Sequence, residues 1–106
     1  MTPPKRTREL IYAVLFVNVF DIAIHVVADE IEILRVIGNV AVLIGGALLV
    51  TNLRHRLIFA GSIAIHLVLN VASVIQYGIG ALGVVLIAAT TLGGAAVVGL
   101  LGRTAS

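Results

Sequence analysis

Four long apolar stretches account for most of this chain and constrain its fold more than any other feature. They cover approximately residues 10–28, 33–51, 57–77 and 80–101. About 20 apolar residues in a helix are enough to cross a hydrocarbon layer roughly 30 Å thick. Hydrophobic residues make up 60% of the sequence and charged residues only 11%, which is too little charge for the surface of a soluble domain. The sequence therefore predicts an all-α integral membrane protein with four spans.

The connections between these stretches are short, which predicts one transmembrane domain over residues 1–106. Short turns make consecutive spans antiparallel neighbours, so we expect an up-down-up-down four-helix bundle. The first stretch follows basic residues, as the apolar region of a signal peptide does. Asn18 and Asp21 interrupt it, however, and no convincing cleavage site follows before Asp29. We therefore expect residues 10–28 to be a retained span.

The basic residues predict how the spans are oriented. They gather before the first span, between the second and third, and after the fourth, as Lys5, Arg6, Arg8, Arg54, Arg56 and Arg103. With four spans these places fall on one side of the membrane, which the positive-inside rule makes cytoplasmic. Both termini are then expected in the cytoplasm. The abundance of Ala, Val, Gly and Leu favours a prokaryotic cytoplasmic membrane.

Polar residues recur at helical spacing within three of the spans. The first carries Asn18, Asp21, His25 and Asp29, the second Glu32, Arg35 and Asn39, and the third Ser62, His66, Asn70, Ser73 and Tyr77. Residues three or four apart share one face of a helix. Ionisable side chains are expensive in lipid and usually face the interior of a bundle, where they are often functional. These stripes therefore indicate a polar core.

A rise of about 1.5 Å per residue allows depths to be compared between spans. It predicts three layers: Asn18 with His66, then Asp21 with Asn39 and Asn70, then His25 with Arg35 and Ser73. Asp21 lies at the centre. One interpretation is a hydrogen-bond network that only fixes helix packing. The other is a proton or cation site, because Asp–His pairs titrate near neutral pH when they are coupled.

Arg35 has two interpretations of its own. It lies about one turn inside the outer boundary of its span, so its side chain could extend to the lipid headgroups or pair locally with Glu32. Alternatively, it points inward toward Asp21. We weigh the two alternatives equally.

His25 and His66 suggest a less favoured hypothesis, a haem b or metal site between the first and third spans. Depth argues against it, because the two histidines are expected about two turns apart, whereas two imidazoles on one haem iron must meet at one level. No cofactor is therefore predicted. The fourth span carries no charge and is rich in Gly, Ala and Thr, which predicts close helix packing and no chemistry.

Several functions lack their sequence signatures. There is no cysteine, no nucleotide-binding glycine loop and no catalytic Ser or zinc-protease motif, so an enzyme is disfavoured. The net charge of +2 and the placement of the basic residues argue against nucleic-acid binding. Three hypotheses remain. The favoured one is proton- or cation-linked transport or permeation by a homo-oligomer in the lipid bilayer. The alternatives are an accessory subunit of a larger membrane complex and a cofactor-binding protein.

Overall fold

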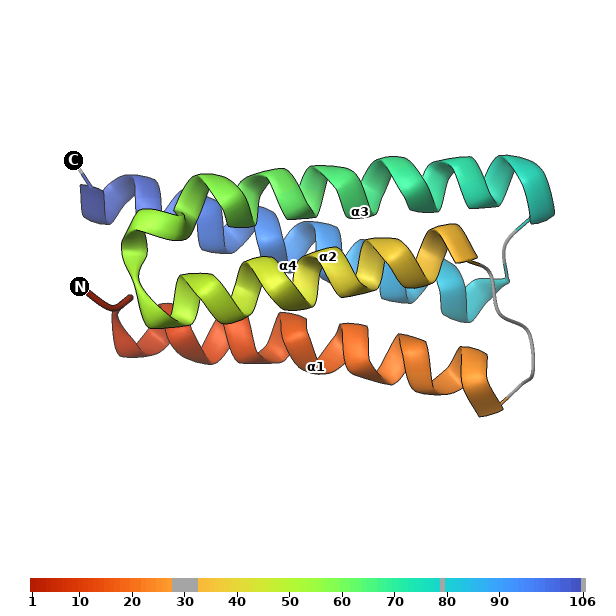
Figure 1. The fold of residues 1–106 in the computed structure, drawn as a ribbon, viewed down its shortest axis with the longest axis horizontal. Helices are drawn as coiled ribbons and strands as arrows, with labels where there is room; N and C mark the ends of the chain where they lie inside the picture. Colours follow the sequence, from red (N-terminus) through yellow and green to blue (C-terminus); the bar gives the residue numbers. More distant parts are fainter. Residues whose placement is uncertain (28–32, 79, 106) are drawn as a thin grey trace.

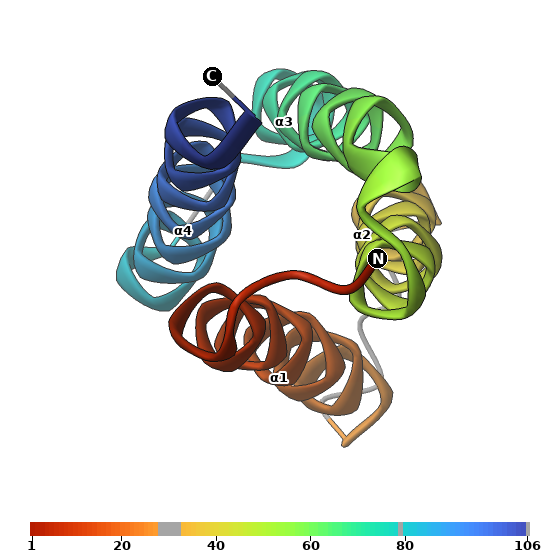
Figure 2. The same ribbon diagram turned by 90° about the vertical axis from the view of Figure 1, so that its left-hand side faces the viewer.

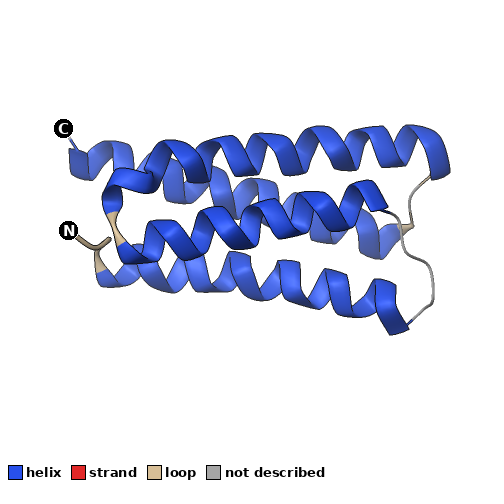
Figure 3. Ribbon diagram, viewed as in Figure 1, coloured by secondary structure: helices blue, strands red, loops and turns tan. Residues whose placement is uncertain are grey.

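Four helices form the computed structural model of this chain, which describes residues 1–27, 33–78 and 80–105. They are α1 (Lys5–Val27), α2 (Ile33–Thr51), α3 (Arg56–Tyr77) and α4 (Ala81–Ala105), with a short 3₁₀ turn η1 (Leu53–His55) between α2 and α3. Figure 3 shows no other regular element in the described part. Each helix is long and apolar enough to cross a membrane, as the hydrophobic stretches predict.

The helices surround a common axis, and each packs against two neighbours. Figure 2 shows the order α1, α2, α3, α4 around the bundle, in which α4 lies beside α1. The beginning of α1 and the end of α4 lie at one end of the bundle (Figure 1), here called the terminal end. The other end, where α1 ends and α2 begins, is called the opposite end. Contacts are most extensive between α2 and α3 and least extensive between α3 and α4.

The helices begin and end close to the predicted boundaries, with one clear difference. α1 begins at Lys5, five residues before the expected 10. The backbone N–H of Arg8 donates to the carbonyl of Pro4 at 2.9 Å, so the helix continues through the basic segment. The polar residues of this segment do not interrupt backbone hydrogen bonding, although they do end the apolar stretch. Residue 28 and the acidic residues Asp29, Glu30 and Glu32 lie outside the described residues.

The turns follow from local chemistry. At the turn between α2 and α3, the side-chain oxygen of Asn52 accepts the backbone N–H of Arg54 at 3.0 Å and so caps η1. The N–H of Leu53 donates to the carbonyl of Met1 at 2.7 Å, which ties the start of the chain to this turn. Gly78 ends α3 with φ +78°, a conformation that side-chain-bearing residues rarely adopt.

Glycines set how closely α2 approaches α3. A Cβ added at Gly45 would lie 2.5 Å from the Oγ of Ser62, and one added at Gly38 would lie 3.2 Å from the Cα of His66. Small residues that let backbones approach closely are common in membrane helix interfaces. The hydroxyl of Ser62 donates to the carbonyl of Phe59 at 2.6 Å, so it is satisfied within its own helix. Ser62 therefore belongs to this packing contact.

Candidate functional site

An ion pair between α1 and α2 lies at the centre of the polar core. The Nη2 of Arg35 lies 3.2 Å from Oδ1 and 3.1 Å from Oδ2 of Asp21, so one nitrogen serves both carboxylate oxygens. Asp21 is 2% exposed and Arg35 is 7% exposed. Two charges withdrawn from solvent this completely depend on each other, because either alone would carry a large desolvation penalty.

Two asparagines hold the pair in place. The Nε of Arg35 donates to the Oδ1 of Asn70 at 2.9 Å, and the Nδ2 of Asn70 donates to the carbonyl of His66 at 2.7 Å. From α2, the Nδ2 of Asn39 donates to Asp21 Oδ2 at 3.3 Å. The guanidinium is therefore oriented by α3 as well as by α1, and the carboxylate has a second donor on α2.

His25 joins the network one helical turn beyond Asp21. Its Nδ1 lies 2.7 Å from the backbone carbonyl oxygen of Asp21 and 3.2 Å from Asp21 Oδ1. Both of these partners accept hydrogen bonds, so Nδ1 carries the proton. We call Asp21, His25, Arg35, Asn39 and Asn70 the ionic network. The ionic network includes residues of α1, α2 and α3. The imidazole of His25 lies on the side of the network that faces the opposite end of the bundle.

The predicted middle layer corresponds to the core of this network, whereas Arg35 departs from its predicted layer. Arg35 was expected beside His25 and Ser73, but its guanidinium contacts Asp21 and Asn70. The reason is the length of the side chain, which starts near the beginning of α2 and extends inward. The structure shows the inward pairing of Arg35 with Asp21, whereas Glu32, the local partner considered in the other alternative, lies outside the described residues. Ser73 is fully buried on the same face of α3, and the side chain of Tyr77 lies outside what the structure describes.

In the layer nearer the terminal end, Asn18 was expected level with His66. Its Nδ2 donates to the carbonyl of Val14 at 2.8 Å and to the Oγ1 of Thr90 at 3.1 Å. The fourth span was expected to serve close packing, and it also contributes a hydrogen bond, because Thr90 on α4 is buried and accepts from Asn18. Sequence reasoning missed Thr90 because a single threonine in a helix rich in small residues gives no periodic signal.

His66 is fully buried and faces the same core. Neither of its ring nitrogens has a hydrogen-bond partner among the described residues. Arg35 bonds both Asp21 and Asn70, so these two residues lie at similar depth. His66 lies one turn from Asn70 toward the terminal end. His25 lies one turn from Asp21 toward the opposite end. The two histidines are therefore about 12 Å apart along the bundle axis. This separation does not fit two imidazoles on one haem iron, and the described residues contain no group of three His, Asp or Glu suited to a metal ion.

An apolar cluster fills the bundle between these polar layers and the terminal end. It receives residues from all four helices: Ile11, Val14, Val42, Leu49, Phe59, Ile63, Val97 and Leu101. Leu10, Leu15, Val50 and Leu53 pack against it. The eight side chains of the cluster are at most 9% exposed, and protein interiors of this kind are close-packed. The core is thus polar toward the opposite end and closed by hydrocarbon toward the terminal end.

The chain is a four-helix bundle of membrane-spanning character with a buried ionic network in one half. No known protein family, curated protein or solved structure matches it. Any function must therefore be argued from the ionic network and its surroundings.

Proposed function

We propose that this protein is a small membrane transport protein in which proton exchange at Asp21 drives or permits passage. The observation that carries the proposal is the Asp21–Arg35 pair, which is almost completely buried and has His25 against the same carboxylate. A carboxylate that can exchange a guanidinium for a proton is the basic element of an intramembrane proton site. A network that served only as packing would not need an ionised pair, since neutral amides such as Asn39 provide comparable hydrogen bonds.

The contacts suggest an order of events. A protonated His25 passes the proton on its Nδ1 to Asp21 Oδ1, 3.2 Å away, and becomes neutral. The neutral carboxylic acid no longer balances Arg35, whose Nε remains bonded to Asn70 Oδ1 at 2.9 Å. Protonation therefore shifts Arg35 toward α3 and loosens the contact between α1 and α2. Release of the proton toward the terminal end requires the apolar cluster to part, and we assign this movement to α4, which packs least extensively against α3.

The basic residues support one orientation of this path. Lys5, Arg6, Arg54 and Arg56 are at the terminal end. By the positive-inside rule this end, with both termini, faces the cytoplasm. Protons then enter from outside and meet the ionic network before the apolar cluster. Four helices leave little space for both a pathway and a shell, so we propose that the working form is a homo-oligomer.

Proton flux into liposomes containing the purified protein tests this proposal. The assay follows an entrapped pH-sensitive dye after a pH step, with a potassium gradient and valinomycin to set the membrane potential. Asp21→Asn keeps the shape of the side chain and removes its charge, and we expect it to abolish the protein-dependent flux. Glu9→Gln is the matched control, because Glu9 is an exposed acid on the same helix, and its flux should equal that of the wild type.

The proposal fails if Asp21→Asn liposomes acidify as fast as wild-type liposomes at equal protein content. It also fails if the wild-type protein adds nothing to the leak of empty liposomes over the full range of imposed pH gradients and potentials. Circular dichroism of the same liposomes confirms that each variant retains its helices.

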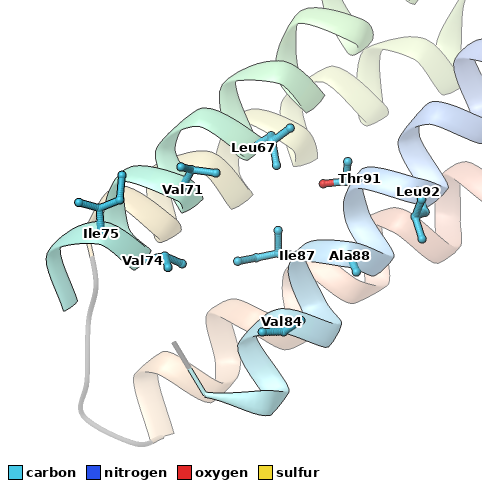
Figure 4. A pocket seen from close by; sticks show the side chains of 9 residues that line it. All are labelled: Leu67, Val71, Val74, Ile75, Val84, Ile87, Ala88, Thr91 and Leu92. Atoms are coloured by element: carbon cyan, nitrogen blue, oxygen red, sulfur yellow. The ribbon is translucent and has the colours of Figure 1, made fainter. Parts of the chain in front are cut away.

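A second candidate function is an accessory subunit that docks onto a larger membrane complex. A groove of about 510 Å³ between α3 and α4 favours it. Figure 4 shows side chains such as Leu67, Val71 and Ile87 along this groove, together with the hydroxyl of Thr91. That hydroxyl is buried and has no hydrogen-bond partner among the described residues. A helix from another protein could fill the groove and satisfy Thr91. Purification in mild detergent from native membranes tests this, since a protein recovered only with copies of itself is not an accessory subunit.

A further inference from the structure

The strongest unexplained feature of the bundle is the side chain of His66. It is fully buried, yet neither ring nitrogen has a hydrogen-bond partner in the described part of the chain. A neutral imidazole has one N–H donor and one acceptor nitrogen. Leaving a buried polar group unpaired is costly, so native structures pair such groups with protein or with ordered water.

Two other unpaired atoms lie close in depth to His66. They are the Oδ1 of Asn18 and the Oδ1 of Asn39. Asn18 precedes Asp21 by three residues and His66 precedes Asn70 by four, so both lie about 4.5–6 Å nearer the terminal end than the ion pair. Asn39 contacts the pair itself through its Nδ2, and its neighbour Gly38 packs against the backbone of His66. We call Asn18, Asn39 and His66 the histidine layer.

The donors and acceptors of the histidine layer define what it can bind. Asn18 uses both hydrogens of its Nδ2, whereas Asn39 uses one of its two for Asp21 in the described part of the chain. The histidine layer therefore presents three acceptors, the two asparagine carbonyl oxygens and one nitrogen of His66. It presents two donors, the other His66 nitrogen and the second Nδ2 hydrogen of Asn39. A ligand for this layer must therefore both donate and accept hydrogen bonds.

Charge further limits which ligands the histidine layer can bind. Asp21 and Arg35 lie near enough for their charges to act on the His66 ring, and they compensate each other. Among the described residues, the histidine layer thus has no uncompensated negative charge that would hold a metal cation, and carbonyl oxygens repel an anion. A small neutral ligand remains, and water both donates and accepts, can enter from solvent and forms about three hydrogen bonds in a buried site.

We propose that the histidine layer is a hydration site, in which buried water bonds both ring nitrogens of His66 and links them to the carbonyls of Asn18 and Asn39. Water here extends the hydrogen-bonded chain from His25 and Asp21 to His66, and the apolar cluster ends it there. If the proposed proton transport holds, His66 lies where the hydrogen-bonded chain meets that cluster. The hydration site itself does not require transport.

Solid-state nuclear magnetic resonance on ¹⁵N-histidine protein in lipid bilayers tests the site. Polarisation is transferred from water protons to the ring nitrogens, and the His66 signals are assigned by their loss in His66→Phe. We expect His66 to receive polarisation from water although its side chain is fully buried. His55, in the turn between α2 and α3, is the positive control in the same sample, because it is partly exposed.

Asn39→Leu sharpens the test, because it removes one carbonyl of the histidine layer and leaves the Arg35–Asn70 contact in place. We expect this variant to weaken the transfer to His66 and leave the transfer to His55 unchanged. The proposal is overturned if wild-type His66 receives no polarisation while His55 does, or if Asn39→Leu leaves the His66 transfer as it was. Neither result bears on the flux of the Asp21→Asn variant, so the two proposals fail separately.

Discussion

Because Asp21 and Arg35 form a buried ion pair, we expect replacing one of them to cost more unfolding free energy than replacing both. Asp21→Asn removes the charge that faces Arg35 in this pair, and Arg35→Gln leaves the carboxylate with Asn39 and His25 among the described residues. Breaking a buried ion pair typically costs about 3–5 kcal/mol. Arg35 is the third residue of α2, so in an opened bundle it can extend to the headgroups, which brings the expected cost to the lower end, about 3 kcal/mol.

The double variant Asp21→Asn/Arg35→Gln distinguishes an ion pair from independent contacts. It removes both charges together and leaves two amides that can bond each other. We therefore expect it to be more stable than either single variant, with a loss of about 1–2 kcal/mol. The free energy of unfolding is measured in lipid bicelles by steric trapping, in which two introduced biotin tags bind bulky streptavidin only when the helices separate.

Additive losses would refute this reasoning. If the double variant loses as much stability as the two single variants together, Asp21 and Arg35 contribute independently and the buried pair does not exist as described. Single losses below about 1 kcal/mol, the range of exposed pairs, would show instead that water reaches both side chains.

Four further substitutions test the packing around the network, each measured by the same unfolding assay. Gly45→Ala should destabilise the protein by about 1–3 kcal/mol, since its Cβ would lie 2.5 Å from Ser62 Oγ. Gly61→Ala is the control, because an added Cβ there would have nothing within 4 Å, and it should change stability by less than about 1 kcal/mol. Thr90→Val should cost about 1 kcal/mol, because it removes the acceptor of Asn18 Nδ2; an unchanged stability would deny that α4 is bonded to α1. Phe59→Ala should cost about 3 kcal/mol and open the apolar cluster. A proton leak should then appear even when Asp21 is replaced by Asn. The absence of a leak in that double variant would contradict the sealing role of the cluster.

The sequence was sufficient to predict the helices and the faces that they bury. Length and hydropathy define four spans, and the three-to-four spacing of Asn18, Asp21 and His25 selects the buried face of α1, where all three are indeed buried. Depth along a helix follows from a constant rise per residue, which is why Asp21, Asn39 and Asn70 could be assigned to one level. These inferences use only local geometry.

The partners within the core could not be predicted in the same way. Arg35 reaches past its own level because a long side chain does not obey the rise per residue of the helix, and its choice between headgroups and Asp21 depends on how closely α1 and α2 pack. Thr90 gave no periodic signal. Whether His66 finds a hydrogen-bond partner depends on which N–H groups of Asn18 and Asn39 already donate to other residues. Those bonds form only when α4 and Asp21 are in place.

The proposed transport function depends most on Asp21 exchanging Arg35 for a proton. The carboxyl ¹³C resonance of Asp21, recorded in lipid bilayers and identified by its loss in Asp21→Asn, reports this exchange directly. We expect it to move from the position of an ionised carboxylate to that of a carboxylic acid as the pH falls through the range in which proton flux occurs. A resonance that stays at the ionised position at every pH at which the protein carries protons would contradict the account, and would leave the pair as a structural contact.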